Sequence, residues 1–392
     1  MEDLGWSVGP GYRLRRELGR GGYGQVCEAE STTTGQRVAI KRFERIFRDA
    51  LDAKRVLREI SILPQLPSRY VAQLIDLLPL SPATEDLYAV LQLAESDLRK
   101  VLRSDVVLDP AHVQVLLYKT LCGLKFIHSA GVIHRDLKPA NILVNSDCSV
   151  LICDFGLARD SVFPQQSLPT LTKHVATRWY RAPEVILLED NYSTPVDIWS
   201  LGCVFGELLG KLAGSRHQGP LFPGRSCYPM SPARRLGLLP AEVLEAEDQL
   251  AVTFQVLGSP ASLEFLSSAE KRQYVSNFAV KSKADFTHWY PTASPQAVDL
   301  LESMLQFDPA NRITVENALA HAYFQSIRTP TFEETAFCPV RLPFDSSQEL
   351  SIPTLRQLLV KEVERYHPVH KARWSVDCQS KREPVRRGER SC

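Results

Sequence analysis

Four polar residues whose side chains suit phosphoryl transfer lie close together in the chain. Asp136, Lys138 and Asn141 belong to the run His134-Arg-Asp-Leu-Lys-Pro-Ala-Asn141, and Asp154 opens the later triplet Asp154-Phe-Gly156. Phosphoryl transfer needs a group that positions the attacking hydroxyl, a cation against the growing negative charge, and hard oxygen ligands for a metal ion. Asp136 and Lys138 fit the first two roles, and Asn141 with Asp154 fits the third. The segment predicts a site that uses ATP as co-substrate and Mg²⁺ as cofactor.

A glycine-rich run near the N-terminus suits the phosphates of such a nucleotide. It reads Gly19-Arg-Gly21-Gly-Tyr-Gly24-Gln-Val26, and glycines let backbone N–H groups approach phosphate oxygens closely. The alternative is a dinucleotide-binding loop of an oxidoreductase, which needs a helix directly after the glycines. Here a β-type run, Val26-Cys-Glu-Ala-Glu30, follows instead. The predicted contacts with ATP in this loop are Gly19, Arg20, Gly21, Gly22, Tyr23, Gly24 and Val26.

A lysine and a glutamate extend the predicted catalytic set. Lys41 ends the apolar run Val38-Ala-Ile-Lys41, and a buried ammonium group demands anions. The predicted helix that follows supplies Glu59, and ATP would supply two phosphates. Taken singly, Lys41 reads equally well as a surface lysine. The order of glycine loop, lysine strand and acid-bearing helix favours a catalytic pair of Lys41 and Glu59.

Patterns along the chain predict an α+β fold with two lobes. Short β-type runs broken by turn signals fill the region from Tyr12 to about Val90, interrupted by a helix over roughly 48–63. A helix capped by Asp109, with Pro110 at its first position, opens a mainly helical second half. The segment 194–209 is apolar on nearly all faces apart from Asp197, Ser200 and Glu207, which predicts a buried helix in which Asp197 needs a partner. An irregular insert covers about 210–247.

Composition excludes several classes of protein. The 392 residues contain 44% hydrophobic and 23% charged residues with a formal net charge of +1, which favours a folded, soluble protein without nucleic acid or membrane as a main partner. Nine cysteines without a Cys-x-x-Cys pair, behind a start that lacks a secretory apolar core, predict reduced thiols. We therefore expect a cytoplasmic protein, with the nucleus as a second location. The basic tail, 371–392, is predicted to be disordered.

Together these motifs resemble eukaryotic protein kinases over about residues 12–325. Ala182-Pro-Glu184 and Asp197-Ile-Trp-Ser200 add to the likeness. Val175-Ala-Thr-Arg-Trp-Tyr-Arg181, Leu221-Phe-Pro-Gly224 and Leu257-Gly-Ser-Pro260 narrow it to the mitogen-activated protein kinases. The resemblance implies a two-lobed kinase fold with a small β-rich lobe that holds one main helix and a larger helical lobe. The implied segments are an N-terminal extension 1–11, the lobes 12–93 and 94–325, and a C-terminal extension 326–370 that packs on both lobes.

The same resemblance implies further contacts. Glu184 would pair with Arg312, and Asp197 would hold the backbone of the catalytic loop. Leu91 stands at the gatekeeper position, while Gln92 and Ala94 would offer backbone groups to adenine. The ATP site would be completed by Ala39 and by Asp97 at the ribose.

Substrates and regulation are also implied by the resemblance. The hydroxyl acceptors would be serines or threonines followed by proline, because Lys138 suits this class and the proline pocket would consist of Val175, Arg178 and Arg181. Thr172 would be the activation-loop phosphosite, modified by an upstream kinase or by self-phosphorylation, with a phosphate pocket of Arg55, Arg58, Arg135 and Arg159. We expect a monomer.

Two departures from the family pattern stand out. The activation loop reads Thr172-Lys-His174 and lacks the family's tyrosine, which resembles the divergent Thr-x-His kinases of apicomplexan parasites. After His321-Ala-Tyr-Phe324, where the family's acidic docking patch is expected, Glu333 and Glu334 are the only acids close by. The alternative function is a catalytically silent scaffold. Silent scaffolds usually lack a residue that matches Lys41, Asp136 or Asp154, and this chain contains all three.

Overall fold

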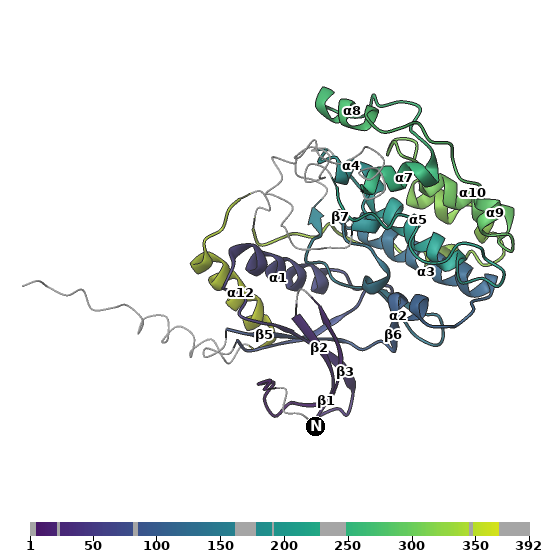
Figure 1. Ribbon diagram of the computed structural model, residues 1–392. Coiled ribbons are helices and arrows are strands. Elements are labelled where there is room, and N and C mark those ends of the chain that lie inside the picture. The colour runs from purple at the N-terminus through teal and green to yellow at the C-terminus, as the bar shows by residue number, and fades with distance from the viewer. Residues whose placement is uncertain are drawn as a thin grey trace, which may run out of the picture. The chain divides into compact units, whose positions relative to one another are not determined.

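The computed structural model describes residues 5–21, 24–80, 85–160, 178–189, 192–227, 248–344 and 348–367 (Figure 1). It forms two compact units, which are described separately: Met1–Ile60 with Leu74–Leu93 and Leu350–Cys392, and Ser61–Gln73 with Ala94–Glu349. Several predicted features lie outside the described residues. They are Gly22, Tyr23, Thr172, His174, Val175, the greater part of the insert and the tail 371–392.

The first unit contains an antiparallel five-stranded sheet in the order β1-β2-β3-β5-β4. The bounds are β1 Tyr12–Gly21, β2 Gly24–Ser31, β3 Arg37–Phe43, β4 Leu74–Leu78 and β5 Leu87–Gln92. Alternating side chains of these strands form a core around Val38, Ile40 and Tyr88, against which Trp6 and Val8 pack. The sheet and the helix between β3 and β4, α1 (Ala50–Ile62), confirm the sequence prediction for this half.

Two helices accompany this sheet. Helix α1, Ala50–Ile62, buries Ala53, Leu57 and Ile60, whereas Leu51 is 41% exposed. Helix α12, Ile352–Tyr366, begins at Ser351, whose hydroxyl accepts a hydrogen bond from a backbone N–H of the first turn. Its buried side chains are Leu355, Leu359, Glu362 and Val363.

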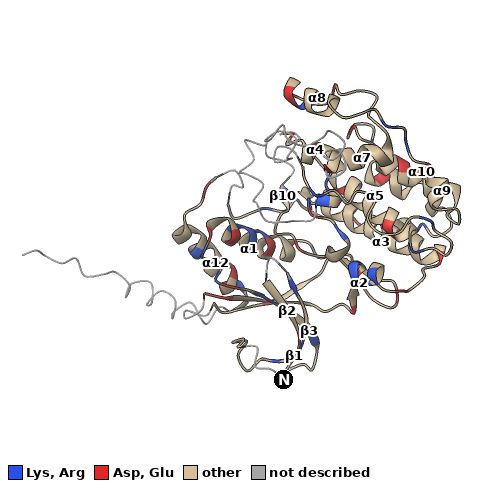
Figure 2. Ribbon diagram, viewed as in Figure 1, with Lys and Arg blue, Asp and Glu red and all other residues tan. Residues whose placement is uncertain are grey.

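The second unit is mainly helical. Helix α3, Pro110–Ser129, and helix α5, Pro195–Leu209, are buried along most of their length, which confirms both predictions. Asp109 occupies the N-cap of α3, but its side chain contacts His112 and makes no capping bond. Basic residues colour α2, Leu98–Arg103, blue in Figure 2. The other helices are α4 Pro183–Ile186, α7 Gln249–Leu257, α8 Ala269–Ser276, α9 Phe286–Trp289, α10 Pro295–Met304 and α11 Val315–Leu319.

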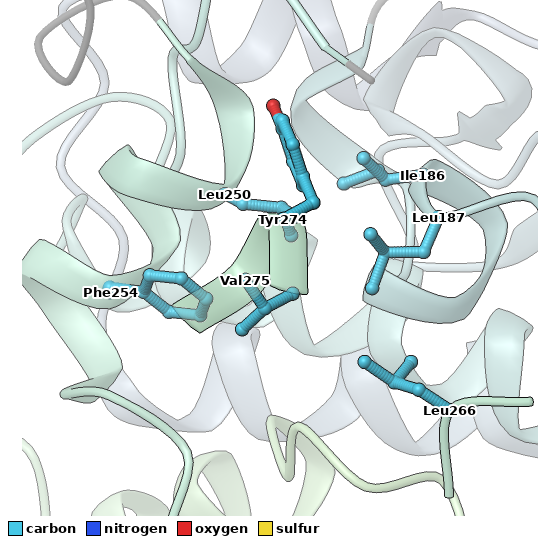
Figure 3. Close-up of a cluster of buried hydrophobic side chains, with 7 residues drawn as sticks. All are labelled: Ile186, Leu187, Leu250, Phe254, Leu266, Tyr274 and Val275. Carbon is cyan, nitrogen blue, oxygen red and sulfur yellow. The ribbon is translucent and has the colours of Figure 1, made fainter. Parts of the chain in front are cut away.

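Short strands position the loops of this unit. Strands β6 Ser96–Asp97, β8 Ile142–Val144 and β9 Val150–Ile152 form a small antiparallel sheet, and β7 Val132–Ile133 pairs with β10 Arg159–Asp160. A buried cluster from α4, α7, α8 and the segment before α8 closes one part of the core; it contains Ile186, Leu187, Leu250, Phe254, Leu266, Tyr274 and Val275 (Figure 3). In the described part of the chain, no helix combines the length and the apolar character that a membrane span requires.

Candidate active site

The predicted catalytic residues of the second unit form a hydrogen-bonded cluster between β7 and β8. Lys138 Nζ lies 2.6 Å from Asp136 Oδ2, and Asn141 Nδ2 donates to the backbone oxygen of Asp136 at 2.8 Å and to its Oδ2 at 3.2 Å. The short helical turn Pro139–Asn141 brings Asn141 back to Asp136. One carboxylate oxygen is therefore held by two donors, which fixes the orientation of the Asp136 side chain.

Asp197 anchors the backbone of this loop from the start of α5. Its Oδ2 accepts hydrogen bonds from the backbone N–H of His134 at 2.9 Å and from His128 Nε2, also at 2.9 Å, while Oδ1 accepts from the N–H of Arg135 at 2.8 Å. Burial alone would raise the pKa of this fully buried carboxyl, but these donors and the neighbouring histidines hold the pKa of Asp197 below its ordinary value. The predicted partner of Asp197 is confirmed as the catalytic-loop backbone.

His134 connects this loop to the segment that carries Asp154. Its Nε2 lies 3.0 Å from the backbone oxygen of Cys153, and its ring makes an edge contact with the fully buried Phe155 at 5.0 Å between ring centres. Arg135 and Asp154 both have φ near +68°, a left-handed conformation that non-glycine residues rarely adopt. Such strain is typical of backbone held in a functional geometry by its surroundings.

The side chains of Asn141 and Asp154 fit a magnesium ion chemically. Asn141 offers an uncharged amide oxygen and Asp154 an anionic carboxylate oxygen, and oxygen is the ligand type that Mg²⁺ prefers. The amide nitrogen of Asn141 donates to Asp136, and within the described part of the chain its amide oxygen is not used as an acceptor. Among these residues no group of three or more His, Cys, Asp or Glu side chains forms a protein-only metal site.

The first unit contains the predicted pair of Lys41 and Glu59. Lys41 Nζ on β3 lies 2.7 Å and 2.9 Å from the two carboxylate oxygens of Glu59 on α1. The side chains are only 12% and 5% exposed. A nearly buried ion pair of this kind gains little for stability because both charges lose water, so its presence favours a role in holding an anionic ligand.

Most of the remaining predicted nucleotide contacts that the structure describes lie on strands of the first unit. Gly24 has φ +131°, and a Cβ there would come within 2.0 Å of the backbone oxygen of Arg42, so only glycine fits at this position. Ala39 pairs with Leu91 in adjacent strands of the first unit, and Val26 pairs with Lys41. Gln92 ends β5. Gly19, Arg20 and Gly21 lie at the end of β1.

Asp97 and Ala94 belong to the second unit. The Asp97 carboxylate caps α2 by accepting the N–H of Lys100 at 3.0 Å, and it is only 7% exposed. This capping contact is a structural role that the sequence reasoning did not assign to Asp97.

Several arginines gather beside the catalytic loop. Burial, followed by the positive charges of Arg159 and Arg181, lowers the pKa of Arg135 to about 10, whereas Tyr192 and Asp197 oppose the change. Arg135 Nη1 donates to the backbone oxygen of Leu157 at 3.2 Å, and its buried Nε has no hydrogen-bond partner among the described residues. The other two predicted pocket arginines, Arg55 and Arg58, lie on α1 of the first unit.

A buried ion pair braces the segment after the activation loop. Arg312 Nη1 and Nη2 lie 2.8 Å and 3.1 Å from the two oxygens of Glu184, and Arg312 also donates to the backbone oxygen of Pro195 at 2.7 Å. Its guanidinium lies over the ring of Trp199. The prediction that Glu184 pairs with Arg312 is confirmed.

Comparisons with known proteins decide the family. The model for the protein kinase domain matches residues 12–219. The chain is 37% identical over 90% of its length to mitogen-activated protein kinase 7 of Arabidopsis thaliana and covers 89% of that protein. It is 39% identical to mitogen-activated protein kinase spm1 of Cytospora mali, with 91% of this chain and 80% of that protein covered.

A further relative is extracellular signal-regulated kinase 1 of Dictyostelium discoideum. It is 39% identical over 91% of this chain, which spans 63% of that protein's length. The chain belongs to the mitogen-activated protein kinases. It is accordingly an ATP-dependent serine/threonine protein kinase with an α+β kinase fold, and the comparisons give no support to a silent scaffold.

Two features of this MAP kinase were missed by the sequence reasoning. His128, near the end of α3, contacts Asp197 although the two are far apart in sequence. Glu207 of α5 is 7% exposed and accepts the hydroxyl of Tyr180 at 2.6 Å. The one available signal was a glutamate inside an otherwise apolar helix, which requires a buried donor.

Proposed function

We propose that this MAP kinase phosphorylates serines and threonines that are followed by proline, and that phosphorylation of Thr172 activates it. The observation that carries the catalytic part is the cluster in which Lys138 and Asn141 both contact one carboxylate oxygen of Asp136. In the proposed reaction Asp136 positions the substrate hydroxyl and accepts its proton, and Lys138 offsets the negative charge that grows on the transferred group.

The proposed cofactor is Mg²⁺, which would neutralise the phosphate oxygens of ATP when bound. Asn141 and Asp154 would hold it through their oxygens. Lys41, oriented by Glu59, would hold the phosphates nearer to the nucleoside. These roles follow from side-chain chemistry and from the family.

The proline preference is supported by the segment around Arg181. In the family likeness, the arginine at this position occupies the carbonyl that would otherwise receive the next substrate N–H, and proline has no N–H to lose. The backbone N–H of Arg181 donates to the oxygen of Arg178 at 3.0 Å, so the two arginines of the proposed pocket share one tight turn. The third proposed member, Val175, lies outside the described residues.

A peptide series tests this preference. A peptide with Ser followed by Pro should be phosphorylated with a much higher kcat/KM than the same peptide with Ser followed by Ala, and a Thr-Pro peptide should behave like Ser-Pro. A peptide with Tyr before Pro serves as the control for the acceptor class. Equal kcat/KM for the Pro and Ala peptides would refute the proposed proline direction without touching kinase activity itself.

The proposed switch at Thr172 is supported by Arg135 and Arg159, two members of the proposed phosphate pocket, which lie close enough for the charge of Arg159 to lower the pKa of Arg135. A phosphate adds nearly two negative charges and three acceptor oxygens, and such a group orders a loop when several arginines meet it. Burial is the main cause of the lowered pKa of Arg135, and the positive charge of Arg159 lowers this pKa further. An added phosphate would remove that repulsion.

Phosphosite mapping with matched variants tests the switch. The kinase is produced alone and again as Asp136→Asn, and phosphorylation of Thr172 is measured by mass spectrometry; loss in the variant identifies self-phosphorylation, while persistence identifies an upstream kinase. Thr172→Ala should lose most activity, whereas His174→Ala should lose little. Equal small losses in both variants would refute the single switch.

We also propose that partner proteins which dock on the segment after Phe324 do not bind through unpaired acidic side chains there. Glu333 is 8% exposed; it accepts Arg328 Nε at 2.7 Å and lies 3.4 Å from Lys125 Nζ. Glu334 lies 3.2 Å from Arg69. Both acids are thus paired within the second unit, so a basic peptide gains little there. Binding of an arginine-rich and a charge-neutral peptide with equal affinity is the expected result.

A further inference from the structure

Helix α5 holds Tyr180, the residue directly before Arg181, at two points. The hydroxyl of Ser200 donates to the backbone oxygen of Tyr180 at 2.7 Å, and the phenol hydroxyl of Tyr180 donates to Glu207 Oε1 at 2.6 Å. Ser200 and Glu207 are two helical turns apart and therefore lie on one face of α5. Both the backbone and the ring of Tyr180 are fixed to a single buried helix.

The residues before Tyr180 are fixed to a different segment. Trp179 Nε1 donates to the backbone oxygen of Gly224 at 3.0 Å, and Arg178 Nη1 donates to the backbone oxygen of Arg225 at 2.6 Å. Gly224 is packed so closely that a Cβ there would come within 2.6 Å of the Cα of Gln249. The turn that carries Arg181 is thus held between this glycine segment and α5.

Burying the carboxyl group of Glu207 costs free energy that an apolar side chain at this position would not cost. Glu207 is 7% exposed, and burial raises its pKa from 4.5 to about 7, against the lowering effects of the Tyr180 hydroxyl and the charge of Arg103. An apolar residue would pack at this position without that cost. Strongly perturbed carboxyls of this kind gather at functional sites, and the only group to which Glu207 is hydrogen-bonded within the described residues is Tyr180.

The geometry points to Glu207 as a positioning residue: through Tyr180 it fixes the turn that presents Arg181, and so sets the selectivity for proline after the phosphoacceptor. This inference rests on the proposed proline direction and deepens it. Releasing the Tyr180 ring removes one of the two points that hold the residue before Arg181, so the turn that rejects non-proline residues is held less firmly. The preference for Ser-Pro over Ser-Ala peptides should fall more than the turnover of the Ser-Pro peptide.

The test compares kcat/KM on the Ser-Pro peptide with kcat/KM on the matched Ser-Ala peptide for the full-length kinase and its variants. In Glu207→Ala and Tyr180→Phe the ratio should fall about tenfold or more, because the hydrogen bond that holds the Tyr180 ring is lost. Glu207→Gln keeps an oxygen that accepts the phenol hydroxyl, so its ratio should stay within about twofold of wild type. Tyr290→Phe is the control, because Tyr290 carries a buried hydroxyl without a hydrogen-bond partner among the described residues.

The outcomes separate the inference from the proposed function. If the wild-type kinase does not distinguish the two peptides, the proline direction itself is wrong. If the wild type prefers proline but Glu207→Ala and Tyr180→Phe keep the full ratio, or lower both kcat/KM values equally, Glu207 is only structural and the inference is overturned. Should Glu207→Ala fail to fold, Tyr180→Phe decides, since it removes a single oxygen and leaves the ring in place.

Discussion

Replacing Asp197 by Asn should destabilise the kinase and disable its catalytic loop together. The substitution keeps the shape of the side chain but turns one acceptor oxygen into an N–H donor. The two carboxylate oxygens receive the N–H groups of His134 and Arg135 and the ring of His128. In either orientation of the new amide, at least one backbone donor of the loop faces another donor.

The magnitude follows from these contacts. A buried donor without a partner costs about 1–3 kcal/mol, and hydrogen bonds that lose their charged acceptor weaken further. We therefore expect the free energy of unfolding to fall by roughly 2–4 kcal/mol. Because the loop backbone next to Asp136 loses its anchor, kcat should fall even at temperatures where the variant is folded.

The assay is urea unfolding followed by fluorescence, with kcat measured separately on the folded variant. Asp299→Asn is a matched control, since Asp299 also pairs with a histidine, His321, at 3.0 Å, but its side chain is 72% exposed. The control should lose at most about 1 kcal/mol, as exposed ion pairs contribute little. Equal losses in the two variants, with kcat unchanged in both, would refute the anchoring role of Asp197.

Three further predictions concern the ionisable residues Arg312, Asp154 and Glu207. Arg312→Met should lower the free energy of unfolding by roughly 3–5 kcal/mol in the same urea assay, because Glu184 is left buried and unpaired; adding Glu184→Met should recover a large part of this loss, and no recovery would contradict the pairing. Asp154→Ala should abolish magnesium-dependent ATP turnover while adenosine binding, measured by calorimetry, survives; an unchanged magnesium dependence would remove Asp154 from the site. Burial raises the pKa of Glu207 from 4.5 to about 7, so between these pH values the folded state keeps a proton that the unfolded chain releases. The contribution of this proton to the free energy of unfolding is complete below pH 4.5 and is lost as the pH rises through 7. Relative to Glu207→Gln, the wild type should thus lose up to roughly 3 kcal/mol of unfolding free energy between pH 4.5 and pH 8, and parallel pH profiles of the two proteins would contradict the raised pKa.

The sequence predicts the features of this fold that are local. The spacing of apolar residues after Pro110 and the nearly continuous apolar run before Gly210 identify α3 and α5 because a helix repeats its face every three or four residues. The motif around Asp136 identifies phosphoryl transfer because several residue types that suit this one reaction rarely occur together by chance.

Only some of the side-chain pairs between residues far apart in the chain can be predicted from the sequence. Glu184 with Arg312 was found through the family likeness, whereas Glu207 with Tyr180 was not, because nothing in the local pattern indicates which distant donor reaches a buried acid. The same applies to His128, which lies on a regular helix and shows its role only where α3 and α5 meet. Leu51 is apolar but exposed, because it lies nine residues before Ile60 and at 3.6 residues per turn therefore falls on the opposite face of α1.

Phosphoryl transfer by Asp136→Asn tests the catalytic role of Asp136 most directly. The transfer of labelled γ-phosphoryl from ATP to a Ser-Pro peptide is measured at saturating magnesium and ATP, alongside nucleotide affinity and thermal unfolding. In Asp136→Asn, kcat should fall about 10²–10⁴-fold, because the group that positions the hydroxyl and accepts its proton is removed, while ATP affinity and the unfolding temperature barely change. Near-normal kcat in this variant would contradict the assignment of Asp136 and the catalytic site built around it.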